Sequence, residues 1–129
     1  MREASLELLA PRADVWGFLA EPYHLPDWWP GISGVEPDRR GFAPGARWKV
    51  QSSKHNWLTG RRTVETMLLV REIHQYERWT WHLLEPPTDV EIVLRARGDH
   101  TEVTVAVSRG DPQRAVKRLY DLVQTAAAS

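Results

Sequence analysis

From Ile32 to Ser108 the sequence consists of short strand-like segments with little between them except turns. The segments are rich in Val, Thr, Trp and Ile, which are enriched in β-strands, and Pro-Asp, Pro-Gly, Thr-Gly, Glu-Pro-Pro and Gly-Asp sequences separate them. Connections this short join antiparallel neighbours, because parallel strands need long crossovers. We therefore predict an antiparallel meander with strands at Ile32–Glu36, Ala46–Ser53, Arg61–Ile73, Arg78–Leu84, Asp89–Ala96 and Thr101–Ser108.

The segment before this meander predicts one further strand and two short helices. Residues Glu3–Leu9 alternate between apolar and polar side chains, which is typical of a strand with one buried face. Pro11 suits the first turn of a helix, where a missing N–H costs nothing. A second helix of a turn or two fits Tyr23–Trp29 and is closed by Pro30-Gly31. The apolar face of the first helix carries Val15, Trp16 and Leu19.

The segment after the meander predicts one long helix, from about Pro112 to Ala127. Asp111 provides an N-cap and Pro112 follows at the first helical position. The order of elements is therefore strand, two helices, six strands and a long helix, an α+β arrangement. The helix presents one apolar stripe, made of Val116, Leu119, Tyr120, Val123 and Ala127.

The apolar face of a seven-stranded sheet must be covered, and one helix about 10 Å wide cannot cover it alone. Large side chains, the two short helices or a ligand must fill the remaining space. The sequence has an unusual supply of large side chains for this purpose, seven tryptophans: Trp16, Trp28, Trp29, Trp48, Trp57, Trp79 and Trp81.

Two N-terminal motifs make the pattern more specific: A-P-R-A-D-V-W-G-F-L-A-E-P from Ala10 and D-W-W-P-G-I from Asp27. With the order β-α-α-β6-α, they resemble the START-like helix-grip superfamily, SRPBCC, and most of all its polyketide cyclase/dehydrase and lipid-transport group. The resemblance implies a seven-stranded curved antiparallel sheet wrapped around a long C-terminal helix, with a hydrophobic cavity between them. It also implies that Trp29, beside Pro30, points inward, and that Trp28 points outward or along the rim. The chain is short for this superfamily, so we expect a small or collapsed cavity.

We expect the ligand-binding residues to be aromatic or to lie on the predicted concave face. Trp79 and Trp81 share one face of a strand and His82 lies on the other, so only one of these sets lines a cavity. The alternative to pocket lining is ordinary core packing for each tryptophan and a position on the solvent face for His82. Tyr120, on the apolar stripe of the last helix, faces either the cavity or the rim. The expected set is Trp29, Trp48, Trp79, Trp81, His82 and Tyr120.

No motif assigns a reaction. The histidines lack metal-ligand spacing, and no G-x-S-x-G or glycine-rich phosphate loop is present, so neither a metal nor a cofactor is expected. The resemblance implies that a cavity arginine could hold an enolate or carboxylate, which makes Arg61 or Arg62 a candidate. A surface pair beside Glu65 is the reading we prefer for these two arginines.

Length and charge narrow the remaining choices. A chain of 129 residues predicts a single domain spanning 1–129. Seventeen basic residues balance 17 acidic ones, which disfavours nucleic acid as the partner. No apolar run approaches the ~20 residues of a membrane span, so no integral membrane segment is expected. The lack of cysteine fits a reducing compartment, and we predict a cytoplasmic protein.

These features favour binding or transport of a hydrophobic small molecule, such as a lipid, an isoprenoid or an aromatic metabolite. The first alternative is a polyketide aromatase/cyclase or dehydratase that uses the same cavity, and whether the chain is an enzyme stays open. The second alternative is a protein-interaction module with a collapsed cavity, which would be favoured if Trp48, Trp79 and Trp81 filled the interior.

Overall fold

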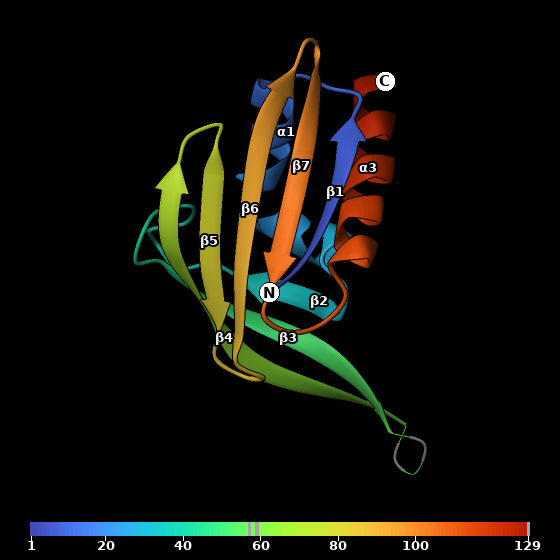
Figure 1. The fold of residues 1–129 in the computed structure, drawn as a ribbon. Helices are drawn as coiled ribbons and strands as arrows, with labels where there is room; N and C mark the ends of the chain where they lie inside the picture. Colours follow the sequence, from blue (N-terminus) through green and yellow to red (C-terminus); the bar gives the residue numbers. More distant parts are fainter. Residues whose placement is uncertain (57, 59, 129) are drawn as a thin grey trace.

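The computed structural model describes residues 1–56, 58 and 60–128, with side chains described except at 53–56, 61–62 and 125–128. It confirms the predicted α+β order and the helix-grip fold, a curved antiparallel sheet with a long C-terminal helix (Figure 1). The elements are β1 Arg2–Leu8, α1 Arg12–Leu19, the 3-10 turn η1 Pro22–His24, α2 Leu25–Trp28, β2 Ile32–Glu36, β3 Arg47–Asn56, β4 Gly60–His74, β5 Arg78–Leu83, β6 Thr88–Arg97, β7 His100–Val107 and α3 Pro112–Ala128.

The sheet is a meander closed by its first strand. Its order is β1-β7-β6-β5-β4-β3-β2, and every neighbouring pair is antiparallel. Register shifts interrupt β2 between Ile32 and Gly34 and β4 between Val70 and Glu72. Such bulges bend a strand and increase its twist, which suits a sheet that must curve around a helix. The far ends of β3 and β4 extend well beyond the rest of the sheet (Figure 1).

One face of the sheet is apolar and lies against the helices. On β5 the buried residues are Trp79, Trp81 and Leu83, whereas Thr80 and His82 between them are partly exposed. The helix α3 packs mainly on β1, β7 and α2, so it covers one side of this face. The rest of the apolar face needs another cover, and the aromatic side chains described below supply it.

The predicted stripe of α3 faces the sheet at Val116, Leu119 and Val123, whereas the side chain of Ala127 lies outside the described part. Leu119 is 0% exposed, and Val116 and Val123 are buried with it. The helix starts as the sequence predicts, because Oδ1 of Asp111 accepts the backbone N–H of Gln113 at 3.0 Å.

The loop between β2 and β3 is folded around the carboxylate of Asp38. Its oxygens accept the backbone N–H groups of Arg47 at 2.9 Å, Arg40 at 3.0 Å and Gly41 at 3.3 Å. These hydrogen bonds lower the pKa of Asp38 below its ordinary value of 3.8, and the bond from Arg47 has the largest effect. The carbonyl of Gly41 then accepts the indole N–H of Trp48 at 2.7 Å, so this loop is tied to the core.

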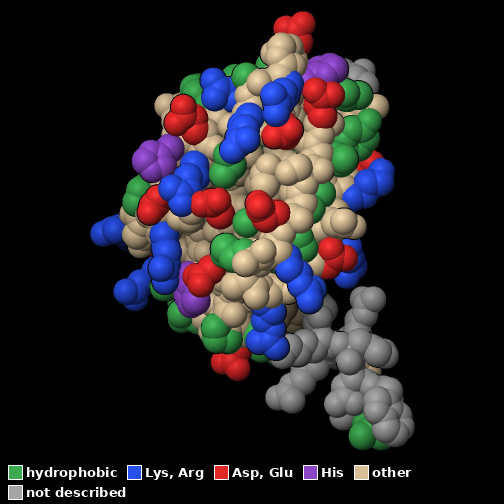
Figure 2. All heavy atoms as spheres, in the orientation of Figure 1, with side chains coloured by type: hydrophobic (Ala, Val, Ile, Leu, Met, Phe, Trp, Pro, Cys, Tyr) green, Lys and Arg blue, Asp and Glu red, His purple; other side chains and the backbone are tan. Residues whose placement is uncertain are grey.

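The opposite face of the sheet is polar. Arg78 bonds Glu91 at 2.6 Å and lies 3.3 Å from Glu72. Figure 2 shows acidic and basic side chains interspersed over the visible face, with no large area of one sign. None of the helices in the described part of the chain is both long and apolar enough to cross a membrane.

Candidate functional site

A continuous cluster of aromatic rings fills the space between the sheet and the short helices. Trp79 lies at its centre, with ring centroids 4.4 Å from Trp81, 4.8 Å from Phe42 and 5.8 Å from Trp48. Trp81 in turn contacts Trp29 at 5.0 Å, with the ring planes at 74°. The strand phase therefore places the tryptophans of β5 on the covered face. Most contacts are edge-to-face, an arrangement that favours close packing of indoles.

The hydrogen-bonding of these indoles is unequal. Trp48, Trp79 and Trp81 are all no more than 1% exposed. Trp48 donates to Gly41, but the Nε1 atoms of Trp79 and Trp81 are buried and have no acceptor among the described residues. A buried donor without a partner is uncommon in native structures and costs free energy.

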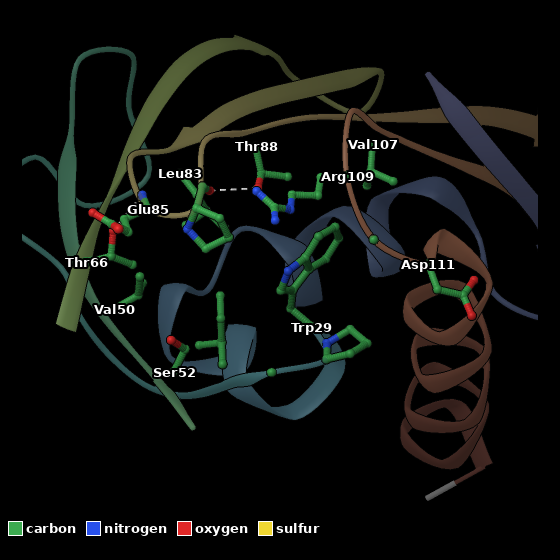
Figure 3. Close-up of a pocket in the computed structure, with 15 residues that line it drawn as sticks. Trp29, Val50, Ser52, Thr66, Leu83, Glu85, Thr88, Val107, Arg109 and Asp111 are labelled. Carbon is green, nitrogen blue, oxygen red and sulfur yellow. Dashed lines mark hydrogen bonds between the residues drawn. The ribbon is translucent and has the colours of Figure 1, made fainter. Parts of the chain in front are cut away.

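A pocket of ≈ 320 Å³ opens at the end of the sheet where this cluster stops (Figure 3). Three connections surround it: the turn after α2, the β5–β6 turn and the loop from β7 to α3. Figure 3 shows these segments converging beside the first turn of α3. Its apolar wall is formed by Trp29, Pro30, Ile32, Val50, Leu83, Pro86 and Val107.

Trp28 and Trp29 are arranged differently from the prediction. Trp28 is 1% exposed and contacts both Trp79 and Trp81, so the expectation that it points outward or along the rim is wrong. Trp29 is 8% exposed and lines the pocket. The reason is local: α2 has only four residues and ends at Trp28, and Trp29 already has an extended backbone with φ −91° and ψ 116°. The 100° step between helical neighbours therefore does not apply to this pair.

The threonine hydroxyl groups of the pocket form hydrogen bonds with the surrounding backbone. Thr88 Oγ1 donates to the carbonyl of Pro86 at 2.8 Å, and Thr66 Oγ1 accepts the backbone N–H of Glu85 at 3.0 Å. Charged residues stand at the edge, namely Glu85, Arg109 and Asp111. In Figure 3 the side chain of Arg109 extends from the β7–α3 loop toward Thr88.

Of the six expected ligand-binding residues, Trp29 alone lines this pocket. Trp48, Trp79 and Trp81 belong to the aromatic cluster behind it, and His82 and Tyr120 lie elsewhere. His82 is on the opposite face of β5, where its Nδ1 lies 2.8 Å from Oδ1 of Asp89. Tyr120 is half-buried at the edge of the core, and Nζ of Lys117 lies 5.4 Å from its ring centroid. The side chains of Arg61 and Arg62, and all of Trp57, lie outside the described residues.

Sequence reasoning did not identify most of the pocket wall. Val50 and Leu83 are ordinary alternating strand residues, and Glu85-Pro86 and Arg109-Gly110-Asp111 indicated only a turn and a helix start. The one available signal was the shared phase of Trp48 with Val50 and of Trp81 with Leu83 along their strands. Among the described residues, no group of three or more His, Asp or Glu could hold a metal ion.

Comparison with protein families gives one match over most of the chain. The sequence model described as "Activator of Hsp90 ATPase homolog 1-like protein" matches residues 9–125. No curated protein matches the sequence.

Solved structures share the fold at low sequence identity. DR_A0006 from Deinococcus radiodurans has a TM-score of 0.74 and 16% identity, covering 96% of this chain and 95% of that one. The di-domain ARO/CYC StfQ of the steffimycin biosynthetic pathway has a TM-score of 0.70 and 22% identity, covering 98% of this chain but 44% of that one. Ara h 8.0201 has a TM-score of 0.68 and 14% identity, covering 98% of this chain and 96% of that one.

Proposed function

The chain belongs to the Activator of Hsp90 ATPase homolog 1-like family, and from this premise and the geometry of its pocket we propose that it binds a hydrophobic small molecule at the end of the sheet. The family match and the shared fold confirm the START-like helix-grip superfamily that the N-terminal motifs resemble. This superfamily uses one scaffold for several functions, so the proposal rests on the pocket and not on the fold.

The observation that supports binding is an apolar wall around a space of suitable size. The volume of ≈ 320 Å³ lies at the lower end of the range of roughly 300–1,000 Å³ typical of small-molecule sites. Trp29, Leu83 and Val107 come from three different segments and converge on this space (Figure 3). An apolar ligand would remove these side chains from water, which is the dominant favourable term in such binding.

The charged residues at the edge of the pocket would orient a bound ligand. Arg109 forms no ion pair with another residue that the structure describes, and it lines the pocket together with Glu85 and Asp111. We expect the apolar part of the ligand to lie against Trp29, with any polar end toward the opening. The other tryptophans of the expected set, Trp48, Trp79 and Trp81, would form the wall behind Trp29.

Binding is favoured over catalysis because the titratable groups of the lining, Glu85, Arg109 and Asp111, are exposed at its edge and its covered wall is apolar. The hydroxyl groups of Thr66 and Thr88 are engaged with the backbone, and none of the histidines whose side chains are described lines the pocket. An aromatase/cyclase or dehydratase needs groups that move a proton and stabilise an oxyanion. The likeness to an ARO/CYC protein keeps that activity as the enzymatic alternative.

A protein-interaction module is the second candidate, and a specific observation favours it. The rings of Trp48, Trp79 and Trp81 pack together where the superfamily resemblance implies a cavity, so most of the interior is closed. The matching family is named after an activator of the Hsp90 ATPase. Under this alternative the purified protein would stimulate ATP hydrolysis by Hsp90 and would bind no small molecule.

The deciding experiment combines native mass spectrometry of freshly purified protein with calorimetric titration of apolar compounds. We expect either a co-purified mass or saturable binding by at least one member of a panel of fatty acids, isoprenoids and aromatic compounds. Ser52→Phe fills the pocket from its rim and should weaken that binding at least tenfold. Lys49→Phe, an exposed position on β3, is the matched control and should leave affinity unchanged. If no compound binds to ligand-free protein, the proposal is wrong.

A further inference from the structure

The unpaired indole N–H groups of Trp79 and Trp81 are not explained by packing alone. Phenylalanine would fill a ring-shaped space without bringing a donor into it, whereas tryptophan brings one that must leave water. Trp48 shows how this fold deals with such a donor, since its N–H reaches the carbonyl of Gly41 at 2.7 Å. Trp79 and Trp81 are as deeply buried as Trp48 and have no such acceptor.

The rings of Trp81 and Trp79 lie in sequence behind the pocket wall. Trp29 lines the pocket on one side and contacts the ring of Trp81 on the other, at 5.0 Å between centroids. Trp79 is the next ring inward, 4.4 Å from Trp81. A single side chain therefore separates a ligand in the pocket from the ring of Trp81, which carries one of the two unpaired donors.

The surroundings of Trp29 allow its ring to move. Its backbone is held where α2 ends, with its N–H bonded to the carbonyl of Leu25 at 2.9 Å. The indole borders the pocket of ≈ 320 Å³, so its ring can rotate about the side-chain bonds into that space. Trp28, by contrast, is enclosed by the rings of Trp29, Trp79 and Trp81.

Given the proposed function, on which this inference rests, we propose that the ligand is a flat apolar molecule with a carbonyl oxygen, that Trp29 swings aside to admit it, and that the oxygen accepts the indole N–H of Trp81. Trp79 supplies a second donor for a ligand that reaches further. The ring of the ligand replaces the edge-to-face contact between Trp29 and Trp81, and its oxygen satisfies a donor that the protein leaves unpaired. Recognition then discriminates against hydrocarbons of the same shape, because a buried donor favours ligands that can pair with it.

Two probes of nearly equal shape test the proposal: 2-acetylnaphthalene and 2-isopropenylnaphthalene, in which a CH₂ group replaces the carbonyl oxygen. Calorimetry should show the ketone binding the parent protein about tenfold more tightly. Trp81→Phe should remove this difference by weakening only the ketone. In ¹H–¹⁵N spectra the indole signal of Trp81 should move downfield with the ketone and not with the alkene, while that of Trp48 stays in place.

Trp48→Phe is the matched control for ring volume. Both substitutions remove the same atoms, but only Trp48→Phe breaks a hydrogen bond of the free protein. Urea unfolding of the ligand-free variants should therefore give the lower midpoint for Trp48→Phe. Equal midpoints would mean that the indole of Trp81 already has a partner in solution, and the proposal would be overturned.

A separate measurement tests whether Trp29 covers the indole of Trp81. Trp29→Ala should speed hydrogen–deuterium exchange at the Trp81 indole and should not affect exchange at that of Trp48. An unchanged rate at Trp81 would show that Trp29 does not cover it, and that part of the proposal would fail.

The outcomes separate this inference from the proposed function. Equal affinity for the two probes, with unmoved indole signals, overturns the role of the N–H groups and leaves hydrophobic binding in the pocket intact. Failure of both probes, and of every compound in the wider panel, removes the proposed function and this inference with it.

Discussion

Trp28 meets its neighbour Trp29 edge to face, with ring centroids 5.5 Å apart and ring planes at 89°, and the deeper ring belongs to Trp28. Trp28→Ala should lower the free energy of unfolding by about 3–5 kcal/mol, because it leaves an indole-sized cavity in the core. Trp29→Ala should cost clearly less and should change ligand binding instead. Urea unfolding and ligand titration of both variants measure the two effects. Equal losses of stability would contradict the assignment of Trp29 to the pocket wall.

The strand phases and the fold could be predicted because the evidence for them is local. On β5 the alternation of Trp79, Trp81 and Leu83 with polar neighbours fixes one face, and turn residues mark where each strand stops. The alternation alone did not say which face is covered. That depends on where α3 and the short helices pack, which is a property of the whole chain.

The pocket could not be predicted because it too depends on how distant segments of the chain pack together. Trp29, Leu83 and Arg109 are far apart in sequence, and each lies in or beside an irregular connection that carries no periodic signal. The misplacement of Trp28 had a different cause. A periodic argument was applied to a four-residue helix that ends before Trp29.

Leu119 should be the most sensitive position on α3, since its side chain is completely buried against the sheet. Leu119→Asp places an unpaired charge in this contact and should cost about 3–5 kcal/mol or unfold the protein. Gln124→Asp, on the exposed side of the same helix, should have little effect. Thermal melts followed by far-ultraviolet circular dichroism compare the two. A parent-like melt for Leu119→Asp would show that α3 is not the main cover of β1 and β7.

Thr101 links the start of β7 to the segment after β1. Its hydroxyl, in a residue that is 0% exposed, donates to the carbonyl of Ala10 at 2.7 Å. Thr101→Val keeps the shape of the side chain but leaves that carbonyl without its partner, which should cost about 1–3 kcal/mol.

The control for Thr101 is Thr104→Val on the same strand. Thr104 pairs with Ser5 at 2.7 Å on the exposed face, where water can replace the lost hydroxyl. This change should cost about 1 kcal/mol or less. If urea unfolding ranks the two variants the other way, the link from Thr101 to Ala10 does not stabilise the protein.

Asp38 should make the stability of the protein depend on pH through the β2–β3 loop. Because its pKa is lowered in the folded protein, chiefly by the N–H of Arg47, its ionised form contributes stability above pH 3.8. That contribution falls away as the pH drops through the still lower pKa of the folded state. Asp38→Ala should therefore be less stable than the parent at pH 7, and the gap should narrow as the pH falls below 3.8. A gap that stays constant in urea unfolding from pH 7 to pH 3 would contradict this account.

The pairing of β1 with β7 has a consequence for how the chain reaches this fold. Ser5 and Thr104, which face each other across these strands, are 99 positions apart, whereas each of the other strand pairs joins successive strands. Closing a loop of that length costs more entropy than forming the hairpins, so the meander from β2 to β7 should assemble first and β1 should join it late. A ribosome releases β1 first, and its strand partner β7 is among the last segments to appear. Until β7 appears, the apolar side of β1 must be kept from pairing with other molecules, and from then until β1 joins the sheet the exposed edge of β7 must be kept from it as well.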